Sequence, residues 1–210
     1  LMATLFADHP YAADPEGTRE DLAKVTSDLL KKRAAAVLFQ KQGYAATGWR
    51  QVIAKSKAPW GSQAHHFPGG KEQLATDALA LAGAEYEDLL RQAMAVHNPA
   101  DAVRMWAAAG AYQLKRSGWT DGCPVATVAL ESAGHSDALA AACHTAFSSW
   151  RAVLTESLVA AGMDEGAEAL ALTVLAGIEG GLLLARAAHD ETLLRDVGDQ
   201  LAELIQQKLP

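Results

Sequence analysis

A set of hydrogen-bond donors lies in the N-terminal third of the chain, close to two predicted helix starts. Thr47 and Ser62 carry hydroxyl groups, His65 and His66 carry imidazoles, and Lys71 adds a positive charge. Such side chains, together with the free backbone N–H groups at helix starts, are the donors that proteins use to hold phosphate oxygens. The pattern indicates contacts with a phosphate backbone; the alternative is that the two histidines are surface residues without a role.

Residues 47–67 have the anatomy of a helix-turn-helix. A tight turn of about 3–4 residues holds two helices at a steep angle, so that the second helix can enter a major groove of DNA. The inward-facing residues of this motif are expected to be Val52, Ile53, Ala54, Ala58 and Phe67. The preceding helix is expected to turn a stripe inward that consists of Leu30, Ala34, Val37 and Leu38.

The elements that must position these donors are predicted to be helices. The chain is rich in Ala and Leu, and it has no long alternation of apolar and polar residues. We expect an all-α fold of about nine helices, with spans near 20–42, 49–55, 59–67, 71–97, 99–117, 125–133, 136–162, 164–189 and 191–208. Gly43 is expected to end the first helix, and Thr47, Asn98 and Asp164 are expected to be N-caps.

The net charge of −7 is unevenly distributed along the chain. Residues 19–77 carry ten basic and five acidic side chains, a net charge of +5, whereas residues 78–210 carry eight basic and seventeen acidic side chains, a net charge of −9. A basic part joined to an acidic part suggests that only one end meets a polyanion, although a solvated basic face would have the same composition.

The composition excludes several classes of protein. With 210 residues, 50% hydrophobic and 20% charged, the chain is globular and not disordered. No apolar run reaches the roughly 20 residues that a membrane helix needs. Two cysteines are too few for a disulfide framework, and residues 1–15 lack the basic start and apolar stretch of a secretory signal. We therefore expect a cytoplasmic protein without a membrane partner.

Over about residues 26–80 the chain resembles the DNA-binding domain of TetR-family transcriptional repressors. The residues that carry the likeness are, in order, Gly43-Tyr44, Thr47, Ile53-Ala54, Gly61-Ser62, His65-His66-Phe67 and Pro68-Gly69-Gly70-Lys71-Glu72-Gln73-Leu74. The segment Gly122-Cys123-Pro124-Val125 extends the likeness to the drug-sensing LmrA/YxaF-like subgroup. The resemblance implies a homodimer, a small-molecule pocket in the C-terminal helices, and release of operator DNA when an effector binds.

With this resemblance, the chain is expected to have three parts: a loose arm at 1–18, a helix-turn-helix DNA-binding domain at 19–77, and a ligand-binding and dimerisation domain at 78–210. The predicted DNA-binding residues are Thr47, Lys57, Trp60, Gly61, Ser62, Gln63, His65, His66 and Lys71. Of these, Lys71 and His66 are expected to contact phosphates, and Ser62 and Trp60 to influence the preferred base sequence.

The chain departs from the family pattern at three positions of the motif. Lys57 stands in the turn where the family has glycine, Trp60 stands where a basic residue is usual, and Ala64 stands where a tyrosine is usual. These departures leave an alternative function open, which is a TetR-like small-molecule-binding protein with altered or lost operator recognition.

The acidic part carries aromatic and apolar residues at helical spacing, and the family implies a cavity among them. The predicted ligand-binding residues are Met105, Trp106, Val128, Phe147, Trp150 and Glu179. Such a stripe can equally be ordinary core. Glu179 is expected either to be exposed or to await a cationic group, because a buried carboxylate needs a partner.

No sequence pattern indicates catalysis. The chain lacks G-x-S-x-G, H-E-x-x-H, P-loop and G-x-G-x-x-G motifs, and Cys143 and His144 are neighbours whose side chains diverge on a helix. Adjacent His65 and His66 also diverge, so they are not expected to share a metal ion. We expect a protein that is not an enzyme and that uses no cofactor, no metal and no catalytic residues.

Two apolar stripes near the C-terminus predict the dimer. One consists of Leu170, Val174, Gly177, Ile178, Gly181 and Leu184, and the other of Leu193, Leu194, Val197, Leu201, Leu204 and Ile205. Two copies of these helices would form a four-helix arrangement with two-fold symmetry. That symmetry would present two DNA-binding domains to half-sites about one helical turn, roughly 34–36 Å, apart. The alternative is that both stripes pack inside one monomer.

Overall fold

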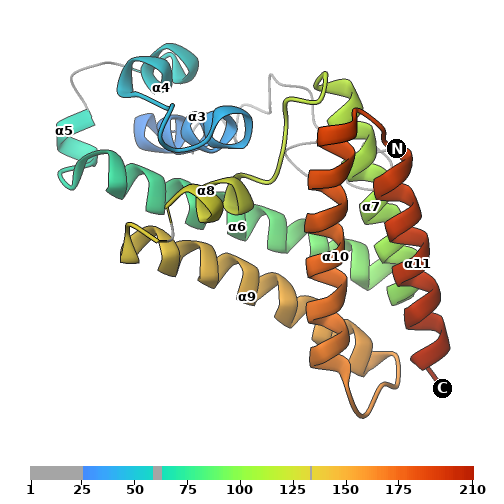
Figure 1. The fold of residues 1–210 in the computed structure, drawn as a ribbon. Coiled ribbons are helices and arrows are strands. Elements are labelled where there is room, and N and C mark those ends of the chain that lie inside the picture. The colour runs from blue at the N-terminus through green and yellow to red at the C-terminus, as the bar shows by residue number, and fades with distance from the viewer. Residues whose placement is uncertain (1–25, 59–62, 133) are drawn as a thin grey trace. The chain divides into compact units, whose positions relative to one another are not determined.

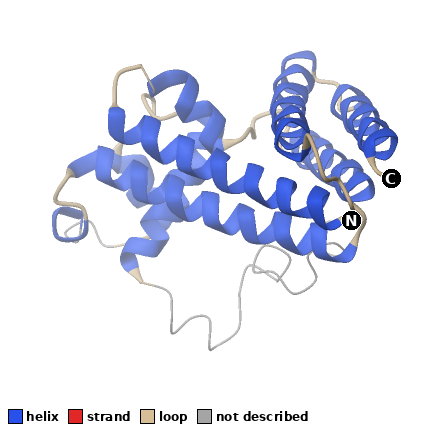
Figure 2. Cartoon of the chain, turned by 90° about the horizontal axis from the view of Figure 1, so that it is seen from below, coloured by secondary structure: helices blue, strands red, loops and turns tan. Residues whose placement is uncertain are grey.

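The computed structural model describes residues 26–58, 63–132 and 134–210, and the regular structure of these residues is entirely helical (Figures 1 and 2). They form α3 (Ser27–Gln42), α4 (Trp49–Ser56), α5 (Gln63–His66), α6 (Gly70–Val96), α7 (Pro99–Arg116), α8 (Pro124–Ser132), α9 (Asp137–Ala160), α10 (Ala167–Ala188) and α11 (Thr192–Lys208). The predicted all-α fold is confirmed. The predicted arm at 1–18 and the start of the 59–67 helix lie outside the described residues.

The described chain divides into two compact units. The N-terminal unit contains residues 26–85 and 124–146, and the C-terminal unit contains residues 86–123 and 147–210. Two long helices, α6 and α9, each contribute residues to both units. The division differs from the predicted domain limits, because α8 and the first part of α9 belong with the helix-turn-helix region.

In the N-terminal unit, α3 packs against α4 and α8. The core contains the fully buried side chains of Phe39, Val52, Leu74 and Leu79. Gly83 of α6 lies so close to α9 that an added Cβ would come within 2.9 Å of the Cβ of Ala146. These contacts explain why residues 124–146 form part of this unit.

In the C-terminal unit, α11 packs along α7 and α10, as Figure 1 shows for the green and red helices. Glycines allow this close packing: a Cβ on Gly177 would lie 2.9 Å from Leu201, and one on Gly181 would lie 3.0 Å from Leu194. Gly180 differs, because a Cβ added at this position would have no other atom of the chain within 4 Å.

The helix starts agree with the prediction where a side chain caps the backbone. The Oδ1 of Asn98 accepts from the N–H of Asp101 at 3.0 Å, and Pro99 occupies the first turn of α7. The cap predicted at Thr47 is wrong, because Gly48 occupies the N-cap of α4. The cap predicted at Asp164 is also wrong, because α10 starts three residues later, after Gly166 in a left-handed conformation.

The inward face of α3 differs from the predicted stripe. Ala34 is buried as predicted, but Leu30 is 37% exposed, and the other buried residues are Lys31, Ala35 and Phe39. Lys31 donates from Nζ to the Ser27 hydroxyl at 3.2 Å, and desolvation lowers the pKa of its ammonium group. The long hydrocarbon part of lysine can occupy an apolar position while the ammonium group keeps a polar partner, so the buried face need not be apolar in sequence.

Among the described helices, only α10 is long and apolar enough to cross a membrane, and 39% of its most apolar window is buried inside the chain. A helix that belongs to the core of a folded domain has the same length and composition. This is weak evidence for a membrane span.

Candidate functional site

The first helix of the helix-turn-helix motif is held by its inner face. Val52 is 1% exposed, whereas Ile53 is half-buried and Ala54 is exposed, so the predicted packing role of Ala54 is wrong. Ala58 and Phe67 are both buried, as predicted. These contacts fix α4, and they leave its outer side to solvent.

The turn after α4 contains one residue in the left-handed conformation. This residue is Lys57, which stands where the family pattern has glycine. Lys57 has φ 53° and ψ 18°, and its side chain is exposed. A residue with a Cβ in this conformation costs on the order of 1–2 kcal/mol relative to glycine. The turn therefore contains a left-handed residue that is not glycine, and the position carries a positive charge.

Five cations of this unit differ in whether a carboxylate pairs with them. On α3, Lys32 pairs with Asp28 at 3.4 Å and with Asp77 at 3.6 Å, and Arg33 pairs with Glu85 at 2.7 Å. The cations of α4 and of the turn that follows are exposed, and they form no ion pair with any residue that the structure describes; they are Arg50, Lys55 and Lys57. The helix-turn-helix therefore carries three exposed positive charges without a counter-charge among the described residues.

Thr47 lies inside the loop between α3 and α4. It is 2% exposed, and its hydroxyl donates to the carbonyl of Gly43 at 2.7 Å. The Nε2 of Gln42 donates to the Thr47 Oγ1 at 3.3 Å. In this arrangement Thr47 holds the loop shape, and its predicted role at a phosphate stays a prediction.

A carboxylate from α8 binds the same loop. Glu131 accepts from the backbone N–H of Tyr44 at 2.6 Å and from that of Ala45 at 3.1 Å. Lys71 donates to the Ala45 carbonyl at 3.4 Å, and its ammonium nitrogen lies 4.1 Å from the centroid of the Tyr44 ring. Desolvation lowers the pKa of Lys71, and Glu131 partly opposes that shift. Lys71 thus braces the loop from the start of α6.

The remaining predicted DNA-binding residues belong to α5 and to the segment before it. His65 is exposed and His66 is half-buried, with ring centroids 5.2 Å apart. The His66 ring also lies against Phe67, at 6.4 Å between centroids. Gln63 is in α5. The predictions at Trp60, Gly61 and Ser62 lie outside the described residues, as does the side chain of Gln63.

The C-terminal unit contains a compact group of aromatic rings. Tyr86 lies 4.8 Å from Trp150 and 6.1 Å from Trp106, and Phe147 lies 5.5 Å from Trp150, all between ring centroids. The indole N–H of Trp106 donates to the Tyr86 hydroxyl. Tilted and edge-on contacts of this kind are the favourable geometries for aromatic pairs.

A carboxylate from α10 joins these rings. Glu179 accepts a hydrogen bond from the thiol of Cys123, and its charge contributes to raising the pKa of Tyr86, after the larger effect of burial. Burial raises the pKa of Glu179 to about 7. We call this group the aromatic–carboxylate cluster; its members are Tyr86, Trp106, Cys123, Phe147, Trp150 and Glu179.

Four of the six predicted ligand-binding residues belong to the aromatic–carboxylate cluster. Met105 is half-buried on α7 beside Trp106, whereas Val128 is buried in the N-terminal unit. Sequence reasoning missed Tyr86 and Cys123. Tyr86 stands between Glu85 and Glu87 in an acidic run that suggests an exposed helix surface, and only its helical register relative to α7 would have placed it among the rings.

Within the described residues, no group of three or more His, Cys, Asp and Glu side chains is arranged to hold a metal ion. Cys143 is buried, its thiol donates to the Val125 carbonyl at 3.5 Å, and burial raises its pKa to about 11. A thiol with such a pKa stays protonated near neutral pH and is a poor nucleophile.

Comparison with known proteins identifies the family. Residues 99–200 match the family model described as the C-terminal domain of LmrA/YxaF-like transcriptional regulators. The helix-turn-helix-type transcriptional regulator YxaF of Bacillus subtilis is 36% identical over 176 residues, which are 83% of this chain and 92% of that protein. LmrA of the same organism, also a helix-turn-helix-type transcriptional regulator, is 37% identical over 180 residues, or 83% of this chain and 94% of that protein.

Solved structures agree at the level of the fold. A regulatory protein TetR from Rhodobacter sphaeroides has a TM-score of 0.75 at 20% identity, and the match covers 84% of this chain and 97% of that one. NemR of E. coli in its reduced form has a TM-score of 0.72 at 16% identity, with 88% and 98% covered. On its helical arrangement and its identity to YxaF and LmrA, the chain belongs to the TetR family of helix-turn-helix transcriptional regulators, in the LmrA/YxaF-like group.

Proposed function

We propose that this transcriptional regulator is a cytoplasmic repressor, that it binds operator DNA as a homodimer through its helix-turn-helix, and that a small apolar or aromatic effector releases it. The observation that carries the proposal is the distribution of positive charge in the N-terminal unit. On α3, Lys32 and Arg33 pair with carboxylates of the same unit, whereas the cations of α4 and its turn are exposed without an ion pair to a described residue. Exposed cations on a helix-turn-helix are suited to DNA phosphates.

The effect of single cations on salt dependence tests DNA binding. Binding to the regulator's own upstream region should weaken as salt rises, because each neutralised phosphate releases counterions. We expect Arg50→Gln and Lys57→Asn each to reduce the slope of log affinity against log salt by about 1, with several-fold weaker binding near 0.15 M salt. Fluorescence anisotropy of labelled DNA between about 0.05 and 0.3 M salt measures the affinity from which the slope is obtained.

Lys32→Gln is the matched control, since Lys32 is already paired with Asp28 and Asp77. Its slope should equal that of the unaltered protein. If Arg50→Gln, Lys57→Asn and Lys32→Gln all kept the slope of the unaltered protein, the exposed cations would not contact phosphates. Absent or salt-insensitive binding of the unaltered protein would instead favour the TetR-like ligand-binding protein that has lost operator recognition.

The proposed dimer needs a face that the chain leaves uncovered. Six of the twelve residues in the two predicted stripes have side chains that are buried within one chain and are not available for a dimer interface. Each is at most 8% exposed; they are Leu170, Val174, Ile178, Leu194, Leu201 and Ile205. The face of α10 that remains open carries Leu172, Leu183 and Leu184, which are 52%, 58% and 59% exposed. Gly180, between them, opens onto empty space. This apolar face with a small residue at its centre suits a second copy of the same helix.

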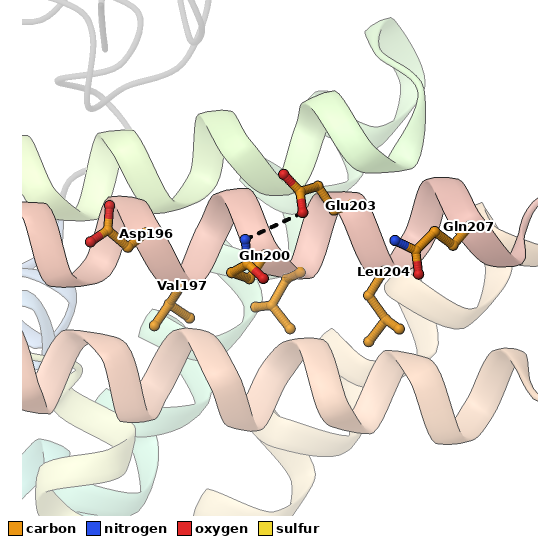
Figure 3. A pocket seen from close by; sticks show the side chains of 7 residues that line it. Asp196, Val197, Gln200, Glu203, Leu204 and Gln207 are labelled. Carbon is orange, nitrogen blue, oxygen red and sulfur yellow. Dashed lines mark hydrogen bonds between the residues drawn. The ribbon is translucent and has the colours of Figure 1, made fainter.

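A shallow groove on α11 borders this helix (Figure 3). It is lined by Asp196, Val197, Gln200, Leu201, Glu203, Leu204 and Gln207, and Gln200 donates to Glu203 at 3.3 Å. Val197 and Leu204 are only half-buried there. An apolar floor with a polar rim is the usual anatomy of a protein interface, so α11 can flank α10 in a two-fold arrangement.

The mass in solution tests the dimer. The unaltered protein should have twice its chain mass of 22.1 kDa at micromolar concentration, and Leu184→Glu should shift the equilibrium towards monomer, because it places a charge in an apolar interface. Leu130→Glu is the control, since Leu130 of α8 is 80% exposed but lies in the other unit. Light scattering distinguishes the two masses. An unchanged mass for Leu184→Glu would place the interface elsewhere.

A further inference from the structure

Glu179 has no cationic partner among the residues that the structure describes. The ion pairs of these residues use other carboxylates. Glu179 accepts a hydrogen bond from the Cys123 thiol, and its charge contributes to raising the pKa of the Tyr86 phenol. A thiol and a phenol can donate hydrogen bonds, but they do not compensate a negative charge. Glu179 is half-buried as a residue, but its carboxyl group is desolvated, and its ionised form has no counter-charge among the described residues. Such a charge is costly in a folded protein, so a compensating charge from outside the chain would be favoured.

The neighbouring rings favour the same sign of charge. The faces of Tyr86, Trp106 and Trp150 present negative electrostatic potential, and a cation within about 6 Å of such a ring centroid is attracted to it. The Trp106 N–H already donates to the Tyr86 hydroxyl, so this hydrogen bond is satisfied without a ligand. Rings with tilted planes offer faces in several directions, as the 55° and 53° angles between Tyr86 and its two tryptophan neighbours show.

We propose that the aromatic–carboxylate cluster binds an organic cation, in which a quaternary or protonated amine is carried on an aromatic body. The ammonium group would lie between the Glu179 carboxylate and the ring faces, and the aromatic body would lie against Phe147 and Trp150. An anionic ligand is disfavoured by Glu179, and a neutral ligand gains nothing from it. The inference rests on the proposed function in one respect, which is that the effector is taken to bind in the C-terminal unit.

A charged probe and its uncharged isostere test the proposal directly. The probe is (biphenyl-4-ylmethyl)trimethylammonium, and the isostere is 4-neopentylbiphenyl, in which carbon replaces the charged nitrogen. Quenching of tryptophan fluorescence reports binding to the whole protein without DNA, because Trp106 and Trp150 belong to the cluster. We expect the cation to bind about tenfold or more tightly than the isostere.

Two variants assign this preference to one carboxylate. Glu179→Gln keeps the shape of the side chain and removes its charge, so the cation should lose most of its advantage over the isostere. Glu168→Gln is the matched control, since Glu168 lies on the same helix and is exposed. The fold is expected to survive Glu179→Gln. Folding raises the pKa of Glu179 from 4.5 to about 7, so the stability of the protein falls as the pH rises from about 4.5 to about 7, and the full cost of ionisation is present at pH 8. Removal of that charge should therefore stabilise the protein at pH 8.

The pH dependence of binding gives an independent readout. The probe is permanently charged, so between pH 6 and pH 8 its affinity should rise about tenfold as Glu179 ionises around a pKa of about 7. Tyr86 and Cys123 are the other titratable groups that act at this position. The rise should persist in Cys123→Ser and in Tyr86→Phe, and it should vanish in Glu179→Gln.

The outcomes separate the proposal from the proposed function. Equal affinity for cation and isostere, no quenching by the cation, or an unchanged affinity in Glu179→Gln would each overturn the cation site. A Glu179-dependent cation that leaves the operator complex intact in a DNA-binding assay would support the site and would contradict its role as an effector site. A protein that binds no operator DNA would contradict the repressor whatever the cation does.

Discussion

Gly43→Ala is expected to lower the free energy of unfolding by about 3 kcal/mol. Gly43 ends α3 with φ 80° and ψ 176°, a conformation that residues with a Cβ hardly adopt, and this strain alone costs on the order of 1–3 kcal/mol. A Cβ at this position would also overlap the carboxylate of Glu131. Displacing that carboxylate removes its hydrogen bonds to the N–H groups of Tyr44 and Ala45. Urea unfolding at a fixed protein concentration measures the change.

A double-mutant cycle separates the two causes. Glu131→Ala alone should cost about 1 kcal/mol, towards the low end for charge-assisted hydrogen bonds because Glu131 is exposed. In that background Gly43→Ala should cost only the backbone strain, about 2 kcal/mol, which gives a coupling of about 1 kcal/mol. Gly134→Ala is the control, since a Cβ at Gly134 meets nothing, and it should change stability by less than about 0.5 kcal/mol. Strictly additive costs would show that Glu131 does not hold this loop.

The loop between α3 and α4 links α8 to the helix-turn-helix through the Glu131 hydrogen bonds. Glu131 lies on α8, and the amides that it binds lie just before α4. If the proposed repressor is correct, loosening this loop should weaken operator binding without any change at a DNA-contacting residue. Glu131→Ala tested in the anisotropy assay should therefore lower the affinity while the salt slope stays that of the unaltered protein, because no phosphate contact is lost.

Local backbone signals were sufficient to predict several element boundaries. Asn98 and Pro99 start α7 as predicted, and Gly43 ends α3, because capping and backbone preference depend on a few neighbouring residues. The left-handed turn at Lys57 agrees with its place in the family pattern. Asp164 failed as a cap for the same local reason, since Gly166 in a left-handed conformation allows α10 to start later.

Which face of a helix is buried could not be predicted as well. On α3 the predicted stripe contains Leu30 but not Phe39, yet Leu30 is exposed, and Phe39 and Lys31 are buried. The buried face is decided by the positions of α4 and α8, which are long-range contacts that periodicity does not contain. The assignment of α8 to the N-terminal unit depends on the same contacts, and the Glu131 hydrogen bonds have no signature in the sequence.

In the candidate ligand site, too, some residues could be predicted from the sequence and others could not. Trp106, Trp150 and Glu179 stand out in the sequence because a large aromatic ring or a carboxylate within an apolar helix is unusual. Tyr86 does not stand out, although it contacts both tryptophans. Its position follows from the register of α6 against α7 and α9, and residues far apart in the chain set that register.

Gly198→Ala is the second large perturbation that the structure predicts, and it acts on the C-terminal unit. Gly198 of α11 is buried against α7, and an added Cβ would overlap the Cβ of Ala107. That neighbour is a methyl group attached to the backbone, so the overlap can be relieved only if the two helices move apart. Overpacking of this kind costs up to about 3 kcal/mol, and the better helix propensity of alanine returns about 1 kcal/mol. The expected net loss is about 2 kcal/mol.

Removing the opposing methyl group should restore the packing. On its own, Ala107→Gly should lower the free energy of unfolding by about 1 kcal/mol, because glycine has a poorer helix propensity. In combination with Gly198→Ala it makes room for the new methyl group. The double variant should therefore be more stable than the sum of the two single changes predicts, by at least about 1 kcal/mol. Gln206→Ala, on an exposed position of α11, is the control and should change stability by less than about 0.5 kcal/mol. Because α11 is also packed against α10, a displaced α11 would disturb the open face of α10 that carries Leu183 and Leu184. Gly198→Ala should therefore also weaken the proposed dimer, and the double variant should regain the dimer affinity of the unaltered protein. A dimer affinity that is unchanged in both variants would show that the interface does not depend on the position of α11.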